Sequence, residues 1–276
     1  MPITHTSHRG LTLPAIGLGT YKLKGAEGAE SVARGIQAGY TLLDSAYNYE
    51  NEGTVGEGVR ASGPRGSLIV TSKLPGRYQK HDDALATVQE SAYRLGLENI
   101  DLYLIHWPNP KQGLYVEAFE ALLEAREAGL VSHVGVCNFL PEHLEALKEA
   151  TGEYPEVNQI ELHPTFPQTE ALAYHAERGI ITEAWSPLRR GGELFEAPEI
   201  TGPAQRLGAT PAQVVLAWHV AIGSLPIPKS SDPGRQLANL RAQEFTLTED
   251  EVAAITALGR PDGRMKDQDP AVYEEF

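Results

Sequence analysis

Four polar side chains in the first half of the chain could together deliver a proton to a carbonyl oxygen. They are Asp44, Tyr49, Lys73 and His106. Asp44 could keep Lys73 protonated, and a nearby ammonium lowers the pKa of a phenol toward neutral pH. Tyr49 could then donate its proton to the oxygen while His106 hydrogen-bonds the same atom. We expect such a group to stabilise and protonate a developing alkoxide.

Each of these residues, taken alone, also has a structural explanation. Asp44 could cap the turn that follows it, His106 could be a core histidine, and Tyr49 could be an ordinary turn residue. Lys73 is harder to explain in this way, because it directly follows the mostly apolar run 68–72 and so leaves a buried strand. Buried lysines are rare unless they are paired, which predicts a carboxylate partner.

An alkoxide also requires a nucleophile that attacks the carbonyl carbon, and a hydride-donating cofactor fits the remaining polar positions. Trp185 could stack on a flat ring, while Asn138 and Gln159 could hydrogen-bond a carboxamide. Core packing of Trp185 and a solvated strand end at Gln159 are the alternatives.

The segment that begins at Lys229 has the composition of an anion site. Lys229, Ser230 and Ser231 precede Arg235 and Asn239 where a helix is expected to begin. The N–H groups of a helix N-terminus, with Lys, Arg and hydroxyl groups beside them, suit a phosphate. A solvated helix start is the alternative explanation.

Metal and serine chemistry lack their usual motifs in this sequence. There is no His-Glu-x-x-His, and His163 and His175 have no ligand partners at usable spacing. The Gly-x-Ser-x-Gly elbow of serine hydrolases is also absent. We therefore expect no metal ion and no serine nucleophile.

Composition narrows the class of protein further. The 276 residues carry a formal net charge of −14, which argues against nucleic acid or an anionic membrane as a partner. Cys137 is the only cysteine, so no intramolecular disulfide or cysteine-based zinc cluster can form. The N-terminus lacks the apolar core of a signal peptide, and no run of about 18 apolar residues occurs. We expect a soluble, cytoplasmic protein.

The polar residues above follow short apolar runs that alternate with amphipathic segments. The runs cover residues 16–18, 41–43, 68–70, 102–105, 131–136, 157–160, 180–182 and 225–227. This alternation predicts parallel strands separated by helices, in a single (β/α)8 TIM barrel over residues 1–276 with a short N-terminal β-hairpin. An open doubly wound sheet is the second choice, since Gly17–Thr20 lacks the third glycine of a dinucleotide fingerprint. In a barrel, the strand ends bring the polar residues to one mouth.

At these same residues the sequence closely resembles the aldo-keto reductase family. The matching stretches are residues 44–52, 71–74, 104–108, 134–139, 158–164, 184–188 and 227–230, in the family's order. The length and short loops look most like the prokaryotic branch that contains 2,5-diketo-D-gluconate reductases.

The resemblance implies a barrel that binds NADPH in extended form across its mouth. It implies a catalytic tetrad of Asp44, Tyr49, Lys73 and His106, with Tyr49 as the general acid. Asn138 and Gln159 would hold the nicotinamide carboxamide, and Trp185 would stack on the ring. Lys229, Ser230 and Arg235 would hold the 2′-phosphate. The complete set of expected cofactor contacts is Gly19, Thr20, Asn138, Gln159, Trp185, Ser186, Leu188, Lys229, Ser230, Ser231, Arg235 and Asn239.

We expect Tyr21, Tyr47, Trp107 and the C-terminal tail (residues 260–276) to wall the substrate pocket. In relatives such a tail covers the pocket, which makes Tyr273 and Phe276 candidates here, although disorder is an equal alternative.

The sequence departs from the family pattern at four places. Cys137 replaces a usual serine, Arg189-Arg190 replaces a glycine-containing stretch, Ala238 replaces a frequent glutamate, and Tyr21 replaces a frequent tryptophan.

Together these observations predict an NADPH-dependent reductase of aldehydes and ketones, with small carbonyls and keto-sugars such as 2,5-diketo-gluconate among its candidate substrates. We expect a monomer whose partner is a small-molecule carbonyl compound, without nucleic acid or membrane. A Schiff-base aldolase that uses Lys73 and a non-catalytic NADP-binding scaffold are the alternatives.

Overall fold

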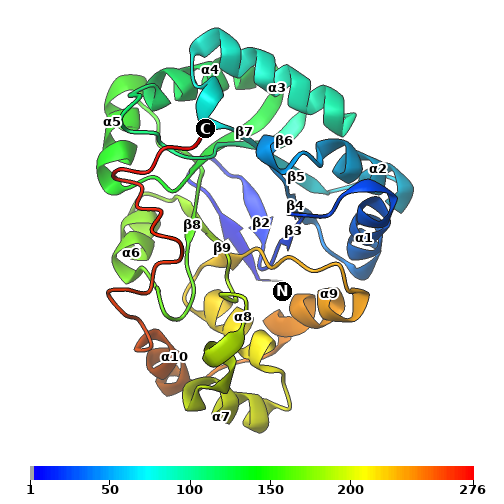
Figure 1. Ribbon diagram of the computed structural model, residues 1–276, viewed down its shortest axis with the longest axis vertical. Helices are drawn as coiled ribbons and strands as arrows, with labels where there is room; N and C mark the ends of the chain where they lie inside the picture. The colour runs from blue at the N-terminus through cyan, green and yellow to red at the C-terminus, as the bar shows by residue number, and fades with distance from the viewer. Residues whose placement is uncertain (1–2) are drawn as a thin grey trace.

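A closed ring of parallel strands forms the centre of the computed structural model, which describes residues 3–276 (Figure 1). Its eight strands within that range are β3 (Leu18–Gly19), β4 (Leu42–Asp44), β5 (Ile69–Leu74), β6 (Ile100–Ile105), β7 (Val131–Cys137), β8 (Val157–Glu161), β9 (Ile181–Trp185) and β10 (Leu225–Pro226). Each strand pairs in parallel with the next along the chain. The N–H groups of Gly17 and Gly19 donate to the carbonyls of Pro226 and Pro228, both at 3.1 Å, which joins β3 to β10. The predicted (β/α)8 barrel is confirmed, and the open sheet is excluded.

Helices surround the barrel as the amphipathic segments predicted. They are α1 (Gly25–Ala38), α2 (Glu52–Ser62), α3 (His81–Leu95), α4 (Tyr115–Glu127), α5 (Pro141–Thr151), α6 (Thr169–Glu177), α7 (Pro198–Leu207), α8 (Pro211–Ala221), α9 (Pro233–Leu240) and α10 (Glu249–Thr256). Short 3-10 helices are η1 (Tyr47–Tyr49), η2 (Gly76–Tyr78), η3 (Gly192–Glu196) and η4 (Arg241–Glu244). Thr210 at the start of α8 and Thr248 at the start of α10 each accept a hydrogen bond from a backbone N–H of the first turn. Both α8 and α10 therefore begin with a capping box.

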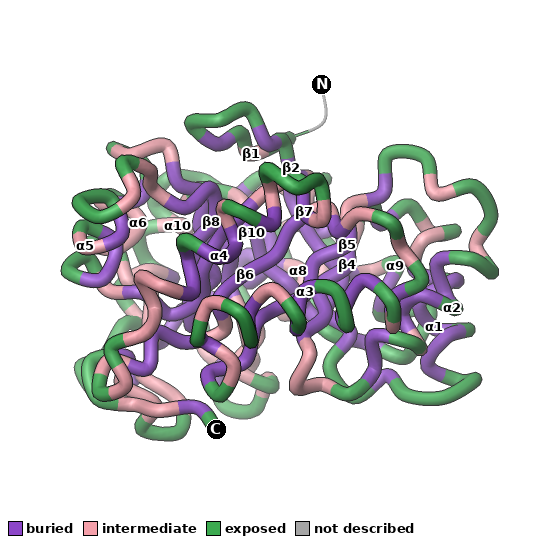
Figure 2. Tube along the Cα trace, turned by 90° about the horizontal axis from the view of Figure 1, so that it is seen from above, coloured by how far each residue is buried: buried purple, intermediate pink, exposed green. Residues whose placement is uncertain are grey.

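The barrel strands are buried on both faces (Figure 2). Inside the barrel, Leu102, Leu104 and Leu225 pack with Leu11 and Leu13 from the N-terminal segment. Larger apolar clusters fill the layer between the strands and the surrounding helices. This burial explains why the strands appear in the sequence as short, continuous apolar runs. Within the described chain, no helix is both long and apolar enough to cross a membrane.

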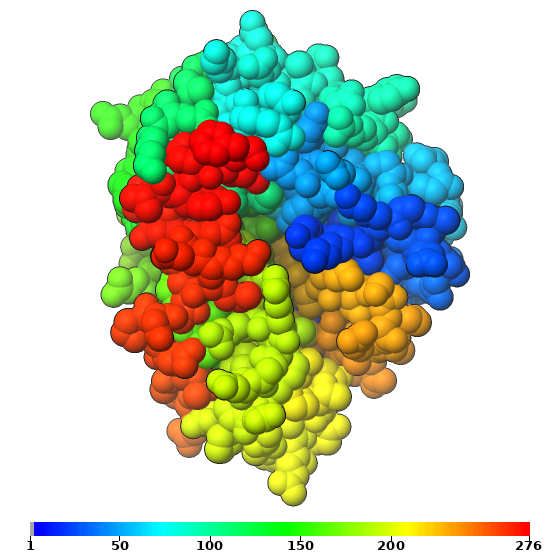
Figure 3. All heavy atoms as spheres, viewed as in Figure 1, coloured from blue at the N-terminus to red at the C-terminus, as the bar shows by residue number. Residues whose placement is uncertain are grey.

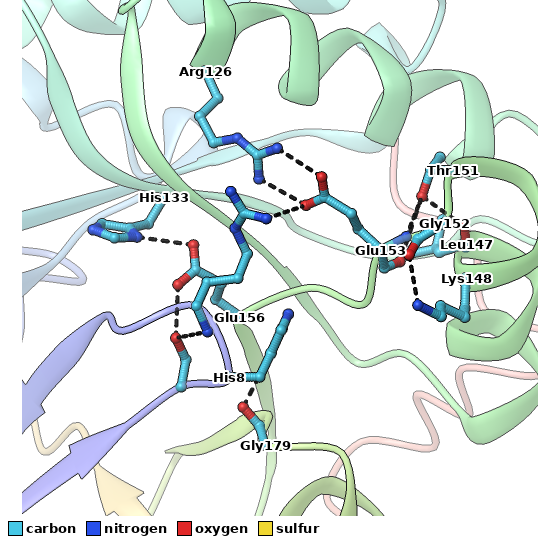
Figure 4. Close-up of polar contacts among 12 residues, drawn as sticks. His8, Arg126, His133, Leu147, Lys148, Thr151, Gly152, Glu153, Glu156 and Gly179 are labelled. Carbon is cyan, nitrogen blue, oxygen red and sulfur yellow. Dashed lines mark hydrogen bonds and ion pairs between the residues drawn. The ribbon is translucent and has the colours of Figure 1, made fainter.

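The predicted N-terminal hairpin is confirmed and lies against one end of the barrel. It consists of β1 (Thr4–Thr6) and β2 (Thr12–Pro14), paired antiparallel. The loop between them is bonded to the barrel: the Ser7 hydroxyl donates to Glu156 at 2.7 Å, and His133 Nδ1 lies 2.8 Å from the other oxygen of the same carboxylate. The N–H of His8 donates to Gly179 at 2.8 Å (Figure 4). A buried carboxylate therefore ties the hairpin to the body of the protein.

The C-terminal tail has a defined path. After α10 it runs past α6 and α5 (Figure 1) to the chain end, where Glu275 contacts Gly76 and Asn109 in the loops that follow β5 and β6. Residues 260–276 contain no regular helix or strand. It lies on the face of the molecule that is hollowed at its centre, where it forms one wall of the hollow (Figure 3).

The Glu156 contact allows a test of how much the hairpin contributes to stability. Replacing Glu156 by alanine leaves the Ser7 hydroxyl and the His133 ring without their shared acceptor, so we expect the free energy of unfolding to fall by about 1–3 kcal/mol. Urea denaturation measures this loss. The matched control is Glu149→Ala on the exposed face of α5; equal stability of the two variants would contradict the assignment.

Candidate active site

A cavity of about 520 Å³ opens at the ends of the barrel strands where we expected chemistry (Figure 3). The structure places many of the predicted residues on its wall: Gly19, Tyr21, Asp44, Tyr49, His106, Trp107, Asn138, Gln159, Trp185, Ser186, Leu188 and Lys229. Five tail residues also line it, namely Met265, Lys266, Gln268, Tyr273 and Glu275. Side chains from distant parts of the chain meet here because parallel strands all end at the same mouth.

Lys73 lies beneath the cavity floor and is fully buried. Its Nζ donates to Asp44 Oδ1 and to the Ser45 carbonyl, both at 2.6 Å. Burial acts to lower the pKa of the lysine, but the Asp44 carboxylate, together with smaller contributions from Tyr49 and Cys137, raises that pKa above its usual value. Lys73 is therefore a fixed positive charge under the site, with the carboxylate partner that its burial required.

Tyr49 stands on η1 with its ring above this charge. Lys73 Nζ lies 5.1 Å from the centre of the Tyr49 ring. We expected the ammonium to bring the pKa of the phenol down toward neutral pH. Lys73 does act to lower this pKa, but burial of the hydroxyl has the larger effect. The net pKa of Tyr49 lies above the usual value, so the expectation of a lowered pKa is wrong. Desolvation is thus the largest contribution to this pKa. Tyr49 consequently stays protonated at neutral pH.

His106 follows β6 and faces Tyr49 across the cavity, with 6.0 Å between the ring centres. Its Nδ1 lies 2.8 Å from Glu275 Oε1 on the tail. Tyr21 packs edge-on against Tyr49 at 5.0 Å, and the Trp107 ring lies 4.5 Å from that of Tyr273. The phenol and the imidazole therefore share one aromatic-walled end of the cavity.

Three side chains in the wall are oriented by hydrogen bonds among the strand ends. The Trp185 indole N–H donates to Asn138 Oδ1 at 2.8 Å, and Asn138 Nδ2 donates to the His106 carbonyl at 3.1 Å. Both amide hydrogens of Gln159 are used, because its Nε2 donates to Asp44 Oδ1 and to Glu183 Oε2, each at 2.8 Å. Only the Gln159 Oε1 acceptor remains for a donor in the cavity.

Positive charge lines the cavity of an otherwise acidic protein. Lys22, Arg190, Lys229 and Lys266 all contribute to the wall. Among the residues that the structure describes, none of these cations has a carboxylate within ion-pair distance. Cations left without counter-ions around a cavity favour an anionic occupant.

Comparison with known proteins identifies the family. The model of the Aldo/keto reductase family matches residues 15–260. The chain belongs to the aldo-keto reductase family. It is 51% identical to 2,5-diketo-D-gluconic acid reductase B of Corynebacterium sp. (strain SHS752001) over 94% of each chain.

Solved structures of the family have the same fold. A mutant of Gox0644 in complex with NADPH matches with a TM-score of 0.94 at 40% identity over 99% of both chains. An aldo-keto reductase of Bombyx mori in complex with NADP matches with a TM-score of 0.89 at 31% identity over 100% of this chain and 98% of the other. As a member of this family, the present chain is an NADP-dependent oxidoreductase.

The cavity of this aldo-keto reductase fits such a cofactor. Unpaired cations suit its phosphates, the Gln159 acceptor suits an amide N–H, and Trp185 offers an aromatic face that is held in place. Arg190 lies on the cavity wall, whereas its neighbour Arg189 does not. The Cys137 thiol is buried, and burial raises its pKa well above the usual value, so at neutral pH it is a neutral thiol.

Other predicted cofactor residues lie off the cavity wall. The Thr20 hydroxyl is fully buried and donates to the Asp44 carbonyl at 2.8 Å. Ser230 accepts from the Asp232 N–H at 3.1 Å, and the Asp232 carboxylate already caps the N-terminus of α9. Ser231 and Arg235 are exposed beside that helix start, and Asn239 is buried within α9.

The structure does not place Tyr47 on the cavity. Its hydroxyl accepts from the Arg94 guanidinium at 3.0 Å, and its ring lies under Arg94 and Arg77 in a separate pocket that Phe276 also lines. Tyr47 and Tyr49 stand at opposite ends of one short 3-10 helix and point to different pockets. The expected pocket roles of Tyr47 and Phe276 are therefore corrected.

Sequence reasoning missed two buried carboxyl groups beside the tetrad. Glu183 on β9 is fully buried, and desolvation raises its pKa from the usual value to about 7, with the nearby Asp44 charge acting in the same direction. Glu183 could have been noticed in the sequence, because it is a charged residue within a strand that is otherwise mostly apolar. Glu275 had no such signal, because the tail has no periodic pattern.

The raised pKa of Glu183 makes stability depend on pH. Between about pH 4.5 and 7 the folded protein keeps a proton on Glu183 that the unfolded chain releases, so rising pH lowers the free energy of unfolding. We expect Glu183→Gln to remove about 2 kcal/mol of this decline between pH 5 and 8, measured by urea denaturation at both pH values. Exposed Glu170→Gln is the control. An unchanged pH dependence in Glu183→Gln would refute the shift.

Proposed function

We propose that this enzyme reduces aldehydes and ketones to alcohols with NADPH, and that Tyr49 is the general acid. The observation that carries the proposal is the fixed Lys73 ammonium, 2.6 Å from Asp44 and 5.1 Å from the ring of a protonated Tyr49, under a cavity that His106 also lines. The net reaction consumes the carbonyl compound, NADPH and one proton, and it forms the alcohol and NADP⁺.

In this proposal, each member of the tetrad has a distinct role. NADPH, when bound, supplies the hydride to the carbonyl carbon. Tyr49 donates its proton to the carbonyl oxygen, and Lys73 stabilises the phenolate left behind. Asp44 keeps Lys73 charged, and His106 donates a hydrogen bond to the same oxygen. Tyr49 then recovers a proton from solvent.

Orientation of the cofactor is assigned to three side chains at or near the ends of β7, β8 and β9. Trp185 would stack on the nicotinamide, Gln159 Oε1 would accept from its carboxamide, and Asn138 would donate to it with the second hydrogen of Nδ2. Lys229 would bind a phosphate, and exposed Arg235 at the start of α9 could join it by moving its side chain.

Anionic carbonyl compounds are the substrate class that the cavity favours. Besides Lys229, which we assign to a cofactor phosphate, Lys22 and Lys266 line the cavity and come from other segments of the chain. A keto acid such as 2,5-diketo-D-gluconate, the substrate in the name of the relative from Corynebacterium sp., has the matching charge. The monomeric state, the cytoplasmic location and the lack of a nucleic-acid partner stay predictions.

An aldolase role for Lys73 has little support. A Schiff base requires a neutral, accessible amine, whereas this ammonium is fully buried and already donates to Asp44 and Ser45. A non-catalytic scaffold would have no use for a buried ion pair placed beneath a phenol.

Tyr49→Phe tests the assignment of the acid. We expect the rate of NADPH oxidation with an aldehyde, followed at 340 nm, to fall by about 10²–10⁴-fold, because the proton donor is lost. NADPH affinity should be nearly unchanged. The matched control is Tyr47→Phe, which removes a hydroxyl outside the cavity and should retain most activity. Turnover by Tyr49→Phe near the wild-type rate would show that another group is the acid.

Lys229→Ala tests the phosphate assignment. Loss of a charge-assisted contact should weaken NADPH binding by about tenfold or more and leave NADH binding much less affected. Titration of cofactor fluorescence gives both dissociation constants, with Lys148→Ala on α5 as the control. Equal losses for NADPH and NADH would place the 2′-phosphate elsewhere.

A further inference from the structure

The tail places a carboxylate directly against the ring of His106. Glu275 is 9% exposed, and its Oε1 lies 2.8 Å from His106 Nδ1. Nδ1 is buried from solvent and the Glu275 carboxylate is in contact with it, although the two groups are not aligned as a hydrogen bond. His106 lines the cavity, so its second ring nitrogen, Nε2, is the one available to a molecule bound there.

The same carboxylate is bonded to two further loops of the active site. Glu275 Oε1 accepts from Asn48 Nδ2 at 2.8 Å, and Oε2 accepts from the Gly76 N–H at 3.0 Å. Asn48 is the neighbour of Tyr49 on η1, and Gly76 follows the strand that carries Lys73. One side chain therefore joins the loops that follow β4, β5 and β6. Tyr49 and His106 lie in the first and last of these loops, and Lys73 lies on β5 itself.

The position of Glu275 is fixed by its own backbone. Asn109, which is fully buried, donates from Nδ2 to the Glu275 carbonyl at 2.8 Å and accepts from the Glu275 N–H at 3.0 Å. The N–H of Lys111 donates to the preceding Glu274 at 2.7 Å. An amide side chain that pairs with both backbone groups of one residue specifies where that residue sits.

Glu275 is charged at neutral pH. Burial acts to raise its pKa, but the contacts with His106, Gly76 and Asn48 outweigh burial and lower that pKa below the usual value. A carboxylate beside Nδ1 stabilises the forms of imidazole that carry a proton there. When Nε2 is protonated as well, it can donate to an oxygen in the cavity, and the ring charge is balanced by Glu275.

We propose that Glu275 is a positioning residue for carbonyl reduction: it holds the Nδ1 proton of His106 and fixes the ring so that Nε2 donates to the substrate oxygen. This inference rests on the proposed role of His106. It also assigns the tail a part in catalysis beyond covering the pocket, because the tail must be docked for Glu275 to contact and orient the His106 ring.

Several other titratable groups surround His106. Tyr49 faces it from η1, Lys73 and Asp44 lie below on β5 and β4, and Cys137 lies on β7. Tyr49 and Cys137 are neutral, and the charges of Lys73 and Asp44 oppose one another. Glu275 is therefore the uncompensated charge in direct contact with the ring.

Glu275→Gln is the decisive variant, because it removes the charge and keeps the shape. We expect kcat for aldehyde reduction to fall about tenfold or more at neutral pH, and the pH profile of kcat to change, because no carboxylate then faces Nδ1. The dissociation constant for NADPH should stay unchanged. Glu274→Gln is the matched control one residue away and should behave like the wild type. Glu275→Asp, which keeps the charge, should recover part of the loss and restore the wild-type profile.

Nitrogen-15 NMR of the histidine rings gives a readout that needs no turnover. In the wild type, the His106 signal, assigned by its loss in His106→Gln, should show Nδ1 protonated at pH 7.5. In Glu275→Gln the Nδ1 signal should lose this signature. If Glu275→Gln keeps both the wild-type NMR signature and the wild-type pH profile, the proposal is overturned, even if the rate falls. If the wild type reduces no carbonyl compound, the proposed function fails, whereas the NMR result still decides whether Glu275 controls the His106 proton.

Discussion

A lysine without solvent contact keeps its charge only if a carboxylate lies beside it, and Asp44 supplies that carboxylate to Lys73 at 2.6 Å. The pair spans neighbouring strands, with Asp44 ending β4 and Lys73 near the end of β5. Removing one partner from such a pair costs about 3–5 kcal/mol, because the other charge is left buried. The barrel register and the position of the charge beneath Tyr49 are therefore maintained by the same interaction.

Outside this pair, the cavity contains both cations without carboxylate partners and a carboxylate in contact with a histidine. The chain carries a net charge of −14, yet the cavity wall holds cations without carboxylate partners among the described residues. On the wall of the same cavity, the tail presents Glu275 to His106. The mouth therefore combines a region suited to phosphates and anionic substrates with a region where one carboxylate controls one imidazole. The first pattern concerns binding, and the second concerns proton placement.

The barrel and most of the site could be predicted because both follow from short-range patterns. Apolar runs mark buried strands, and parallel strands bring residues such as Asp44 and His106 to one mouth. Three features could not be predicted in this way. Tyr47 and Tyr49 differ in direction within one 3-10 turn, which residue spacing does not fix. The rise in the Tyr49 pKa depends on packing that the sequence does not reveal. The location of Glu275 depends on Asn109, a contact 166 residues away along the chain.

The central claim, that the buried Lys73 charge enables proton donation by Tyr49, is tested most directly by single-turnover reduction of an aldehyde with saturating NADPH in Lys73→Met. Circular dichroism and NADPH titration establish that the variant is folded and loaded. The account predicts that the rate of the chemical step falls by at least about 10²-fold while the cofactor still binds. A folded, NADPH-bound Lys73→Met protein that reduces the aldehyde at the wild-type rate would contradict it.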